Sequence, residues 1–121
     1  MASRSLVLKV TAGQDDQERC NQALTVAATA VASGLTVSLW LTGEAAWLAL
    51  PDRASEVALP HAAPLSQLLS KVLDEGTVTV CSQCASRRGI GADDTLKGVR
   101  IAGASTFLAE IMADGAQALV Y

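Results

Sequence analysis

The sequence predicts an α/β fold in which helices cover both faces of a parallel sheet. Short apolar segments rich in β-branched residues alternate along the chain with segments of helical periodicity. This alternation is typical of parallel sheets whose crossover connections are helices. The chain has 121 residues, of which 50% are hydrophobic. We therefore expect one domain, residues 1–121, with a single packed core.

The first strand is predicted at residues 6–10, an aliphatic run with β-branched residues. Asp15 and Asp16 then provide a helix N-cap and an acidic first turn. The helix that follows is expected to reach about Ser33, and Gly34 ends it. Small and apolar residues occur around most of this helix, so we expect it to be buried on more than one side, close against the sheet.

The second strand is predicted at residues 35–41, which are apolar nearly throughout, as in strands covered on both faces. A short helix carries Trp47 and ends at Pro51. Residues 52–63 show no clear periodicity and are expected to form a loop. Pro64 begins the next helix, and Gly76 ends it. The apolar residues of this helix share one face: Leu65, Leu68, Leu69 and Val72.

The third strand is predicted at residues 77–80 and runs directly into Cys81. Residues 99–101 are expected to form a short fourth strand, residues 107–111 belong to a last helix, and residues 116–121 form a terminal strand. Ligands and chemistry collect at the carboxyl ends of strands in open α/β sheets. Cys81 occupies such a position.

Cys81 and Cys84 form a C-x-x-C pair after the third strand. Backbone N–H groups at a helix start, together with Arg87 and Arg88, would favour the thiolate of Cys81 over the thiol. A thiolate is the nucleophile that attacks a sulfur donor, and a persulfide anion needs the same support. The spacing also suits reversible disulfide formation or shared metal ligation.

The remaining cysteine and the single histidine give weaker signals. Cys20 lies on the apolar stripe of the first helix, so we expect a buried, unreactive thiol. His61, beside Pro60 in the loop, could fold over the cysteines as a lid and exchange protons there. No metal site within one subunit is predicted because a structural zinc needs four ligands, although cysteine pairs from neighbouring subunits could meet. No cofactor is predicted, since Gly89 and Gly91 lack the third glycine of a dinucleotide fingerprint.

The charge pattern narrows the choice of partners. The formal net charge is -3, and the longest basic run is Arg87 with Arg88, so we expect no direct binding to nucleic acid. No segment resembles a signal peptide or reaches the ~18 apolar residues of a membrane span. The three cysteines are an odd number, which argues against a disulfide framework. These features predict a cytoplasmic protein without a membrane partner.

Two segments carry a family resemblance. Residues 80–90, VCSQCASRRGI, combine the C-x-x-C pair with a following Arg-Gly turn, and residues 109–116, AEIMADGA, match a last helix and strand. The chain resembles the DsrE/DsrF-like proteins, which include the YchN-like and TusD-like branches of the sulfur-relay superfamily. The C-x-x-C and Arg-Gly combination is similar to the YchN-like branch. The essential cysteine of the TusD-like branch matches Cys81 by its spacing to the Arg-Gly pair.

The resemblance implies a three-layer α/β/α sandwich around a mainly parallel five-stranded sheet, assembled as homotrimers or homohexamers. It also implies that Cys81 accepts persulfide sulfur from a donor protein and passes it to an acceptor protein, as a sulfurtransferase or sulfur carrier. Cys84 would then be an auxiliary thiol. Relay members of this family act as sets of different subunits, whereas this chain could be a stand-alone homo-oligomer.

Three hypotheses follow from these residues. The first is the persulfide carrier, with Cys81 as acceptor and Arg87 and Arg88 as electrostatic support. The second is a dithiol redox protein in which Cys81 and Cys84 cycle through a disulfide. The third is a non-enzymatic oligomer that binds a small ligand or a metal between subunits.

Overall fold

The computed structural model describes residues 4–121. Its centre is a five-stranded sheet in the order β4-β3-β2-β1-β5, with every pair of neighbouring strands parallel. The strands are β1 (Ser5–Val10), β2 (Thr36–Leu41), β3 (Thr77–Cys81), β4 (Val99–Ala102) and β5 (Ala116–Val120). The α-helices are α1 (Gln17–Ala32), α2 (Leu65–Glu75), α3 (Ser82–Arg87) and α4 (Ala104–Ile111). Short 3-10 helices are η1 (Gln14–Asp16), η2 (Gly43–Ala49), η3 (Ala54–Glu56) and η4 (Ala92–Asp94).

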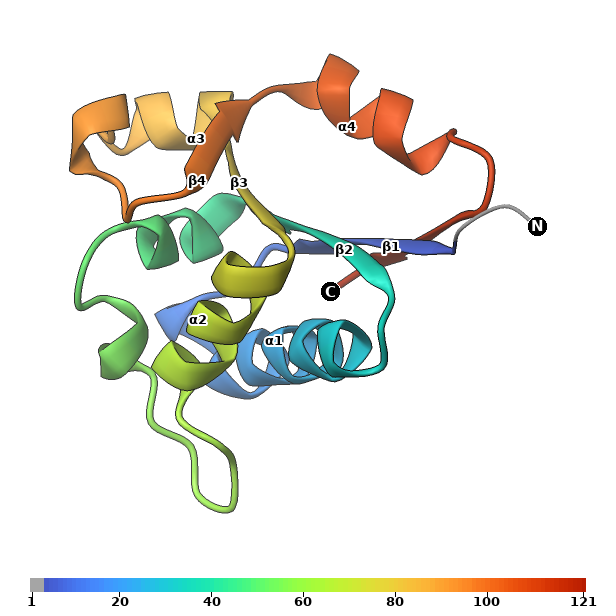
Figure 1. Cartoon of the computed structure of the whole chain (residues 1–121). Helices are drawn as coiled ribbons and strands as arrows, with labels where there is room; N and C mark the ends of the chain where they lie inside the picture. Colours follow the sequence, from blue (N-terminus) through green and yellow to red (C-terminus); the bar gives the residue numbers. More distant parts are fainter. Residues whose placement is uncertain (1–3) are drawn as a thin grey trace.

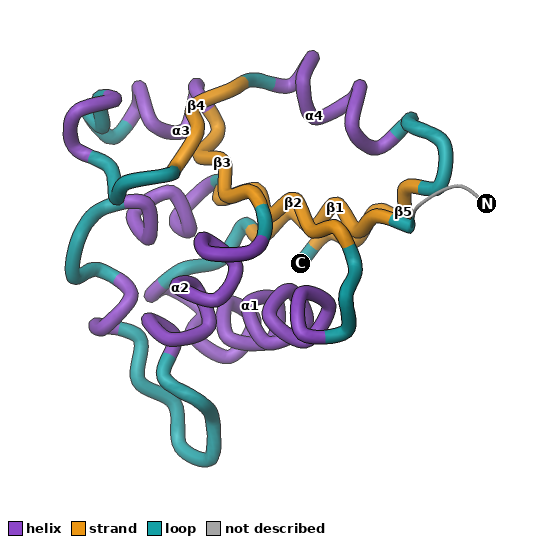
Figure 2. The backbone as a smooth tube through the Cα atoms, viewed as in Figure 1, coloured by secondary structure: helices purple, strands orange, loops and turns teal. Residues whose placement is uncertain are grey.

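Helices cover both faces of the sheet. Figure 1 shows α1 and α2 below it and α3 and α4 above it, and Figure 2 shows the same three layers as a tube. The predicted α/β/α sandwich with a five-stranded parallel sheet is therefore confirmed. At the start of α1 the backbone N–H of Arg19 donates to Asp16 at 3.2 Å, so Asp16 is the predicted N-cap.

The hydrophobic core lies between the sheet and the pair α1 and α2. Side chains alternate between the two faces of a strand, so every second strand residue points into this layer. The buried strand residues of the core are Leu6, Leu8, Val10, Val37, Leu39, Leu41, Val78 and Val80. Cys20 of α1 is fully buried among them, and burial, aided by the charges of Asp15 and Asp16, raises the pKa of its thiol to about 12. The prediction of an unreactive Cys20 fits this position.

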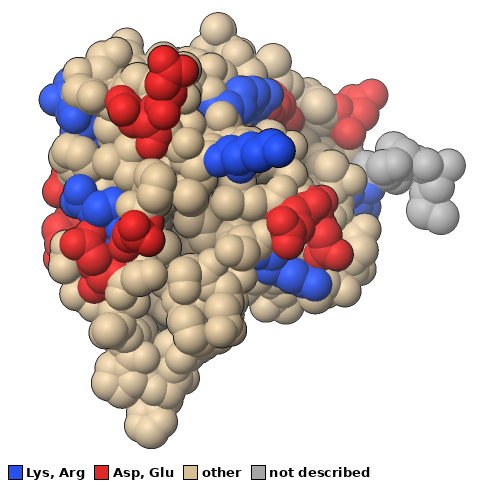
Figure 3. Space-filling view, turned by 60° about the vertical axis from the view of Figure 1, so that its left-hand side comes forward, with Lys and Arg blue, Asp and Glu red and all other residues tan. Residues whose placement is uncertain are grey.

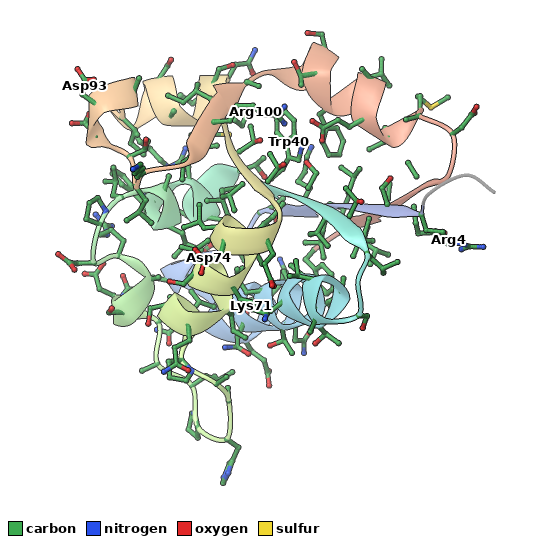
Figure 4. The ribbon with its side chains drawn as sticks, viewed as in Figure 1. Arg4, Trp40, Lys71, Asp74, Asp93 and Arg100 are labelled. Carbon is green, nitrogen blue, oxygen red and sulfur yellow. The ribbon has the colours of Figure 1, made fainter. Side chains whose placement is uncertain are left out.

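The opposite face of the sheet, under α3 and α4, is more polar. The parallel register aligns Lys9 with Trp40, Trp40 with Thr79, and Thr79 with Arg100, which gives one row across four strands. Cys81 follows Thr79 by two residues and therefore lies on the same face. Figure 4 shows Trp40 and Arg100 close together between the sheet and these two helices, and the Arg100 guanidinium lies 5.5 Å from the Trp40 ring centroid.

The segment 57–64 projects away from this polar face. In Figure 1 it extends below α2, and in Figure 3 the same lobe is uncharged because it contains no Lys, Arg, Asp or Glu. The segment forms no strand and includes His61, whose φ of 60° is left-handed. None of the helices in residues 4–121 is both long and apolar enough to cross a membrane.

Candidate functional site

Cys81 joins a strand to a helix. It is the last residue of β3 and the N-cap of α3, where its backbone is extended and its side chain half-buried. Its strand partner is Ala102, the last residue of β4. The segment that leaves β4 at Gly103 runs close to the start of α3, because a Cβ on Gly103 would lie 3.1 Å from the Ser82 hydroxyl. The sulfur of Cys81 therefore sits at the carboxyl edge of the sheet, where the chain leaves two adjacent strands.

The surroundings of Cys81 favour its thiolate. Partial burial opposes ionisation, but interactions with the Cys84 backbone N–H, the Cys84 thiol and the Gln83 N–H outweigh it. The positive charge of Lys9 adds to them, so the pKa of Cys81 lies below the ordinary value of a cysteine thiol. The N–H groups act mainly through their partial charges, since no side-chain cap of full hydrogen-bond geometry forms at Cys81. A lowered pKa raises the ionised share of the Cys81 thiol near neutral pH, and the thiolate is the reactive form of a cysteine.

Cys84 lies one helical turn after Cys81 and is also half-buried. Its sulfur accepts the backbone N–H of Gly43 at 3.2 Å, and its thiol interacts with the sulfur of Cys81. Gly43 has a φ of 54°, and a Cβ there would lie 2.8 Å from the carbonyl oxygen of Thr11. Glycine at this position therefore lets the start of η2 approach Cys84.

The structure places the two arginines differently from the sequence-based expectation. The Arg88 Nη2 and Nε atoms donate to the Glu44 carboxylate at 2.7 and 3.1 Å, and its Nη1 donates to the Cys84 carbonyl at 3.2 Å. Arg87 is exposed. Within residues 4–121, neither guanidinium is among the groups that lower the pKa of Cys81. The reason is position: both arginines follow at the carboxyl end of α3, whereas Cys81 precedes its first turn.

Lys9 is the charged residue that the sequence-based site left out. It is half-buried on the polar face of the sheet, and its Nζ lies 4.6 Å from the centroid of the Phe107 ring. Its signal in the sequence is that of a lone charge inside an apolar strand. The sequence does not show that Lys9 lies near Cys81, because β1 and β3 are brought together only by the strand order, with β2 between them.

His61 does not cover the cysteine pair in this structure. It is exposed and lines a cavity of about 560 Å³ with α1 residues such as Asn21 and Thr25, and with Tyr121. The loop leads into α2, which covers one face of the sheet, while Cys81 lies on the other. The loop returns on the α2 side of the sheet (Figure 1), away from the cysteine pair, so the role of His61 as a lid stays a prediction. In the described part of the chain, no three His, Cys, Asp or Glu residues are grouped closely enough to hold a metal ion.

Glu110 holds α4 above the polar face. Its Oε1 accepts from the Ser38 hydroxyl at 2.6 Å and from Trp40 Nε1 at 3.0 Å, and its Oε2 pairs with Arg100 at 2.6 Å. Arg100 also donates to the Thr79 hydroxyl at 2.8 Å. Partial burial opposes ionisation of Glu110, but hydrogen bonds from Ser38, Arg100 and Trp40 hold its pKa below the ordinary value. This network fixes the helix that carries Phe107, the partner of Lys9.

The sequence of residues 4–121 matches the model of the DsrE/DsrF-like family. The chain belongs to this family. The DsrE/DsrF-like family is generally associated with sulfur relay, which agrees with the resemblance noted for the cysteine segment. No curated protein matches the chain in sequence.

Solved structures share the fold of this DsrE/DsrF-like chain. The ychN protein from Escherichia coli superposes with a TM-score of 0.79 at 20% identity, covering 98% of this chain and 99% of that chain. MTH1491 from Methanobacterium thermoautotrophicum gives 0.73 at 14% identity, covering 98% and 100%. BT1422 from Bacteroides thetaiotaomicron gives 0.57 at 18% identity, covering 95% and 94%. At these identities the likeness shows a common fold.

Proposed function

We propose that the protein carries persulfide sulfur on Cys81 between a donor and an acceptor protein. The observation that supports this most is the environment of Cys81, a half-buried strand-end thiol whose pKa is lowered by the start of α3, by Cys84 and by Lys9. Membership of a family associated with sulfur relay supports the same chemistry. Because such a thiol needs a reducing compartment to stay free, we also propose a cytoplasmic location.

Sulfur uptake is a displacement at sulfur. The Cys81 thiolate attacks the outer sulfur of a donor persulfide, a new S–S bond forms to Cys81, and the S–S bond of the donor breaks. The donor leaves as a thiolate, and no external oxidant or reductant is consumed. An acceptor thiolate then attacks the outer sulfur on Cys81 in the same way, which regenerates the Cys81 thiolate. The groups that stabilise the thiolate also stabilise the persulfide anion.

The test is sulfur loading from a small persulfide donor, followed by intact-mass measurement. Wild-type protein is expected to gain the mass of one sulfur atom, and the gain should be reversed by excess thiol. Cys81→Ser should gain none because it lacks the nucleophile. Cys20→Ser is the matched control, because that thiol is fully buried. Sulfur uptake by Cys81→Ser equal to that of wild type would refute the assignment.

A second candidate function is dithiol redox exchange between Cys81 and Cys84. The C-x-x-C spacing and the side-chain interaction of Cys84 that lowers the pKa of Cys81 favour it, since thiols one helical turn apart form reversible disulfides. The Cys84→Ser variant separates the two functions. A one-cysteine carrier retains sulfur loading in this variant, whereas a dithiol enzyme loses all turnover with an oxidised glutathione substrate.

We further propose that the chain assembles as a homotrimer or homohexamer through α4 and β5. Helix α4 has no buried residue although most of its side chains are apolar, and β5 is an edge strand with mostly exposed residues. Exposed apolar side chains lie on these elements or directly beside them: Leu108 at 57%, Met112, the residue after α4, at 73%, and Val120 at 64% exposure. Clustered exposed apolar side chains mark protein interfaces.

Charge introduced on this surface is expected to break the assembly. Met112→Glu should reduce the mass measured by light scattering from that of a trimer or hexamer to that of one chain, because the carboxylate loses its hydration in the interface. Gln67→Glu is the control, since Gln67 is exposed on α2, on the other face of the sheet. Wild-type protein that already scatters as a single chain would rule out the proposed assembly.

A further inference from the structure

The ammonium of Lys9 has no carboxylate partner within the described part of the chain. It is half-buried, and none of the ion pairs within residues 4–121 includes it. Its Nζ lies over the Phe107 ring, which is itself packed edge-on against Trp40 with ring centroids 5.3 Å apart. The aromatic face attracts the cation, so Phe107 holds the Lys9 side chain under α4 and away from bulk water.

The strand register places this ammonium on the side of the sheet where Cys81 lies. Lys9 pairs with Trp40 and Trp40 with Thr79, and Cys81 lies two residues beyond Thr79 on the same face. Two strand spacings separate Lys9 from β3, roughly 10 Å. Cys81 lies a further ~7 Å along β3 beyond Thr79, and a lysine side chain spans about 6 Å, so the charge of Lys9 acts on the sulfur through space and without a direct contact.

We infer that Lys9 is a positioning residue for the anionic sulfur of Cys81, stabilising both the thiolate and the persulfide through the field across the polar face. This role rests on the proposed function of Cys81. Phe107 offers the ammonium the face of a ring and no formal charge, and an anion on Cys81 adds a formal negative charge on the same face of the sheet. The coulombic effect of Lys9 on Cys81 is consistent with this geometry.

Other charges near Cys81 are neutralised or distant from its sulfur. Arg88 is paired with Glu44 between α3 and η2, and Arg100 is paired with Glu110 between β4 and α4. On α3 itself, the Cys84 thiol helps to lower the pKa of Cys81, and the exposed Arg87 lies at the far end of the helix. Among residues 4–121, Lys9 is therefore the unpaired charge on the same face of the sheet as Cys81.

The test measures the pH dependence of Cys81 alkylation by iodoacetamide, with the modified peptide quantified by mass spectrometry. Lys9→Met should move the midpoint to higher pH and lower the rate near neutral pH about two- to fivefold. Lys9→Arg should restore the wild-type midpoint because it keeps the charge. Lys97→Met is the matched control, since it removes the same charge from an exposed loop residue. High salt should reduce the difference between the alkylation midpoints of wild type and Lys9→Met, because salt screens the charge of Lys9.

The outcomes separate this inference from the proposed function. An unchanged midpoint in Lys9→Met, with normal sulfur loading of wild type on Cys81, would overturn the role of Lys9 and leave the carrier function intact. A raised midpoint in Lys9→Met, with no sulfur loading by wild type, would keep the electrostatic role and overturn the carrier function. If Lys9→Met fails to fold, two other results decide. A Lys9→Arg midpoint equal to that of wild type, with a wild-type midpoint that changes with salt, supports the inference. A wild-type midpoint that does not change with salt contradicts it.

Discussion

Trp40→Ala is expected to lower the free energy of unfolding by about 3–5 kcal/mol, the range for truncating a large buried aromatic side chain. Trp40 is 1% exposed and is the largest of the fully buried side chains. Its ring packs edge-on against Phe107 at an interplanar angle of 81°, and its Nε1 donates to Glu110. The variant therefore loses packing between the sheet and α4 together with a hydrogen bond to a carboxylate. Urea unfolding followed by circular dichroism, at a fixed protein concentration, measures the loss.

Trp47→Ala is the control for Trp40→Ala. Trp47 is half-buried in η2, and its ring is covered by the Arg53 guanidinium at 4.6 Å from the centroid. Its truncation removes a similar ring from a more exposed place and should cost clearly less. Equal losses in the two variants would contradict the view that Trp40 joins α4 to the sheet.

The second large effect is expected at Glu110. Glu110→Gln should lower the free energy of unfolding by about 1–2 kcal/mol, because it removes a charge-assisted hydrogen bond and leaves Arg100 without its partner. The lower end reflects the 39% exposure of the Arg100 side chain. The same substitution should change the response to acid.

The sign of the acid effect follows from the lowered pKa of Glu110. A carboxylate with a lowered pKa in the folded state stabilises that state fully above its ordinary pKa of about 4.3. This stabilisation is lost as the pH falls through the folded-state pKa, and we expect the contact between α4 and Trp40 to loosen there. The Trp47→Phe variant keeps Trp40 as its one tryptophan. Its fluorescence should report the acid transition when Glu110 is present. Its persistence, unchanged, in Glu110→Gln would show that another group controls it.

Much of the fold can be predicted from local sequence patterns. The aliphatic segments of β1 and β2 and the Asp16 cap of α1 follow from hydrophobic pattern and capping chemistry within a few residues. The position of Cys81 at the end of β3 and the start of α3 follows in the same way. These features depend on neighbours in the chain, which a single sequence contains.

The electrostatics of the site could not be predicted because they depend on distant partners. Lys9 acts on Cys81 only because β1 lies two strands from β3, and Arg88 pairs with Glu44 across 44 positions. Sequence proximity suggested Arg87 and Arg88 instead. Lone charges in apolar elements were the available signal: Lys9 in β1, Arg100 in β4 and Glu110 in α4 all face the polar layer.

The most direct test of the central claim, that Cys81 is the activated sulfur of this protein, is labelling of the wild type with limiting iodoacetamide at a series of pH values. Each cysteine-containing peptide is then quantified by mass spectrometry. We expect Cys81 to be modified first, with a midpoint below the ordinary cysteine pKa of about 8.5, and the buried Cys20 to stay unmodified. Earlier modification of Cys84 or Cys20, or a Cys81 midpoint at or above that ordinary value, would contradict the claim.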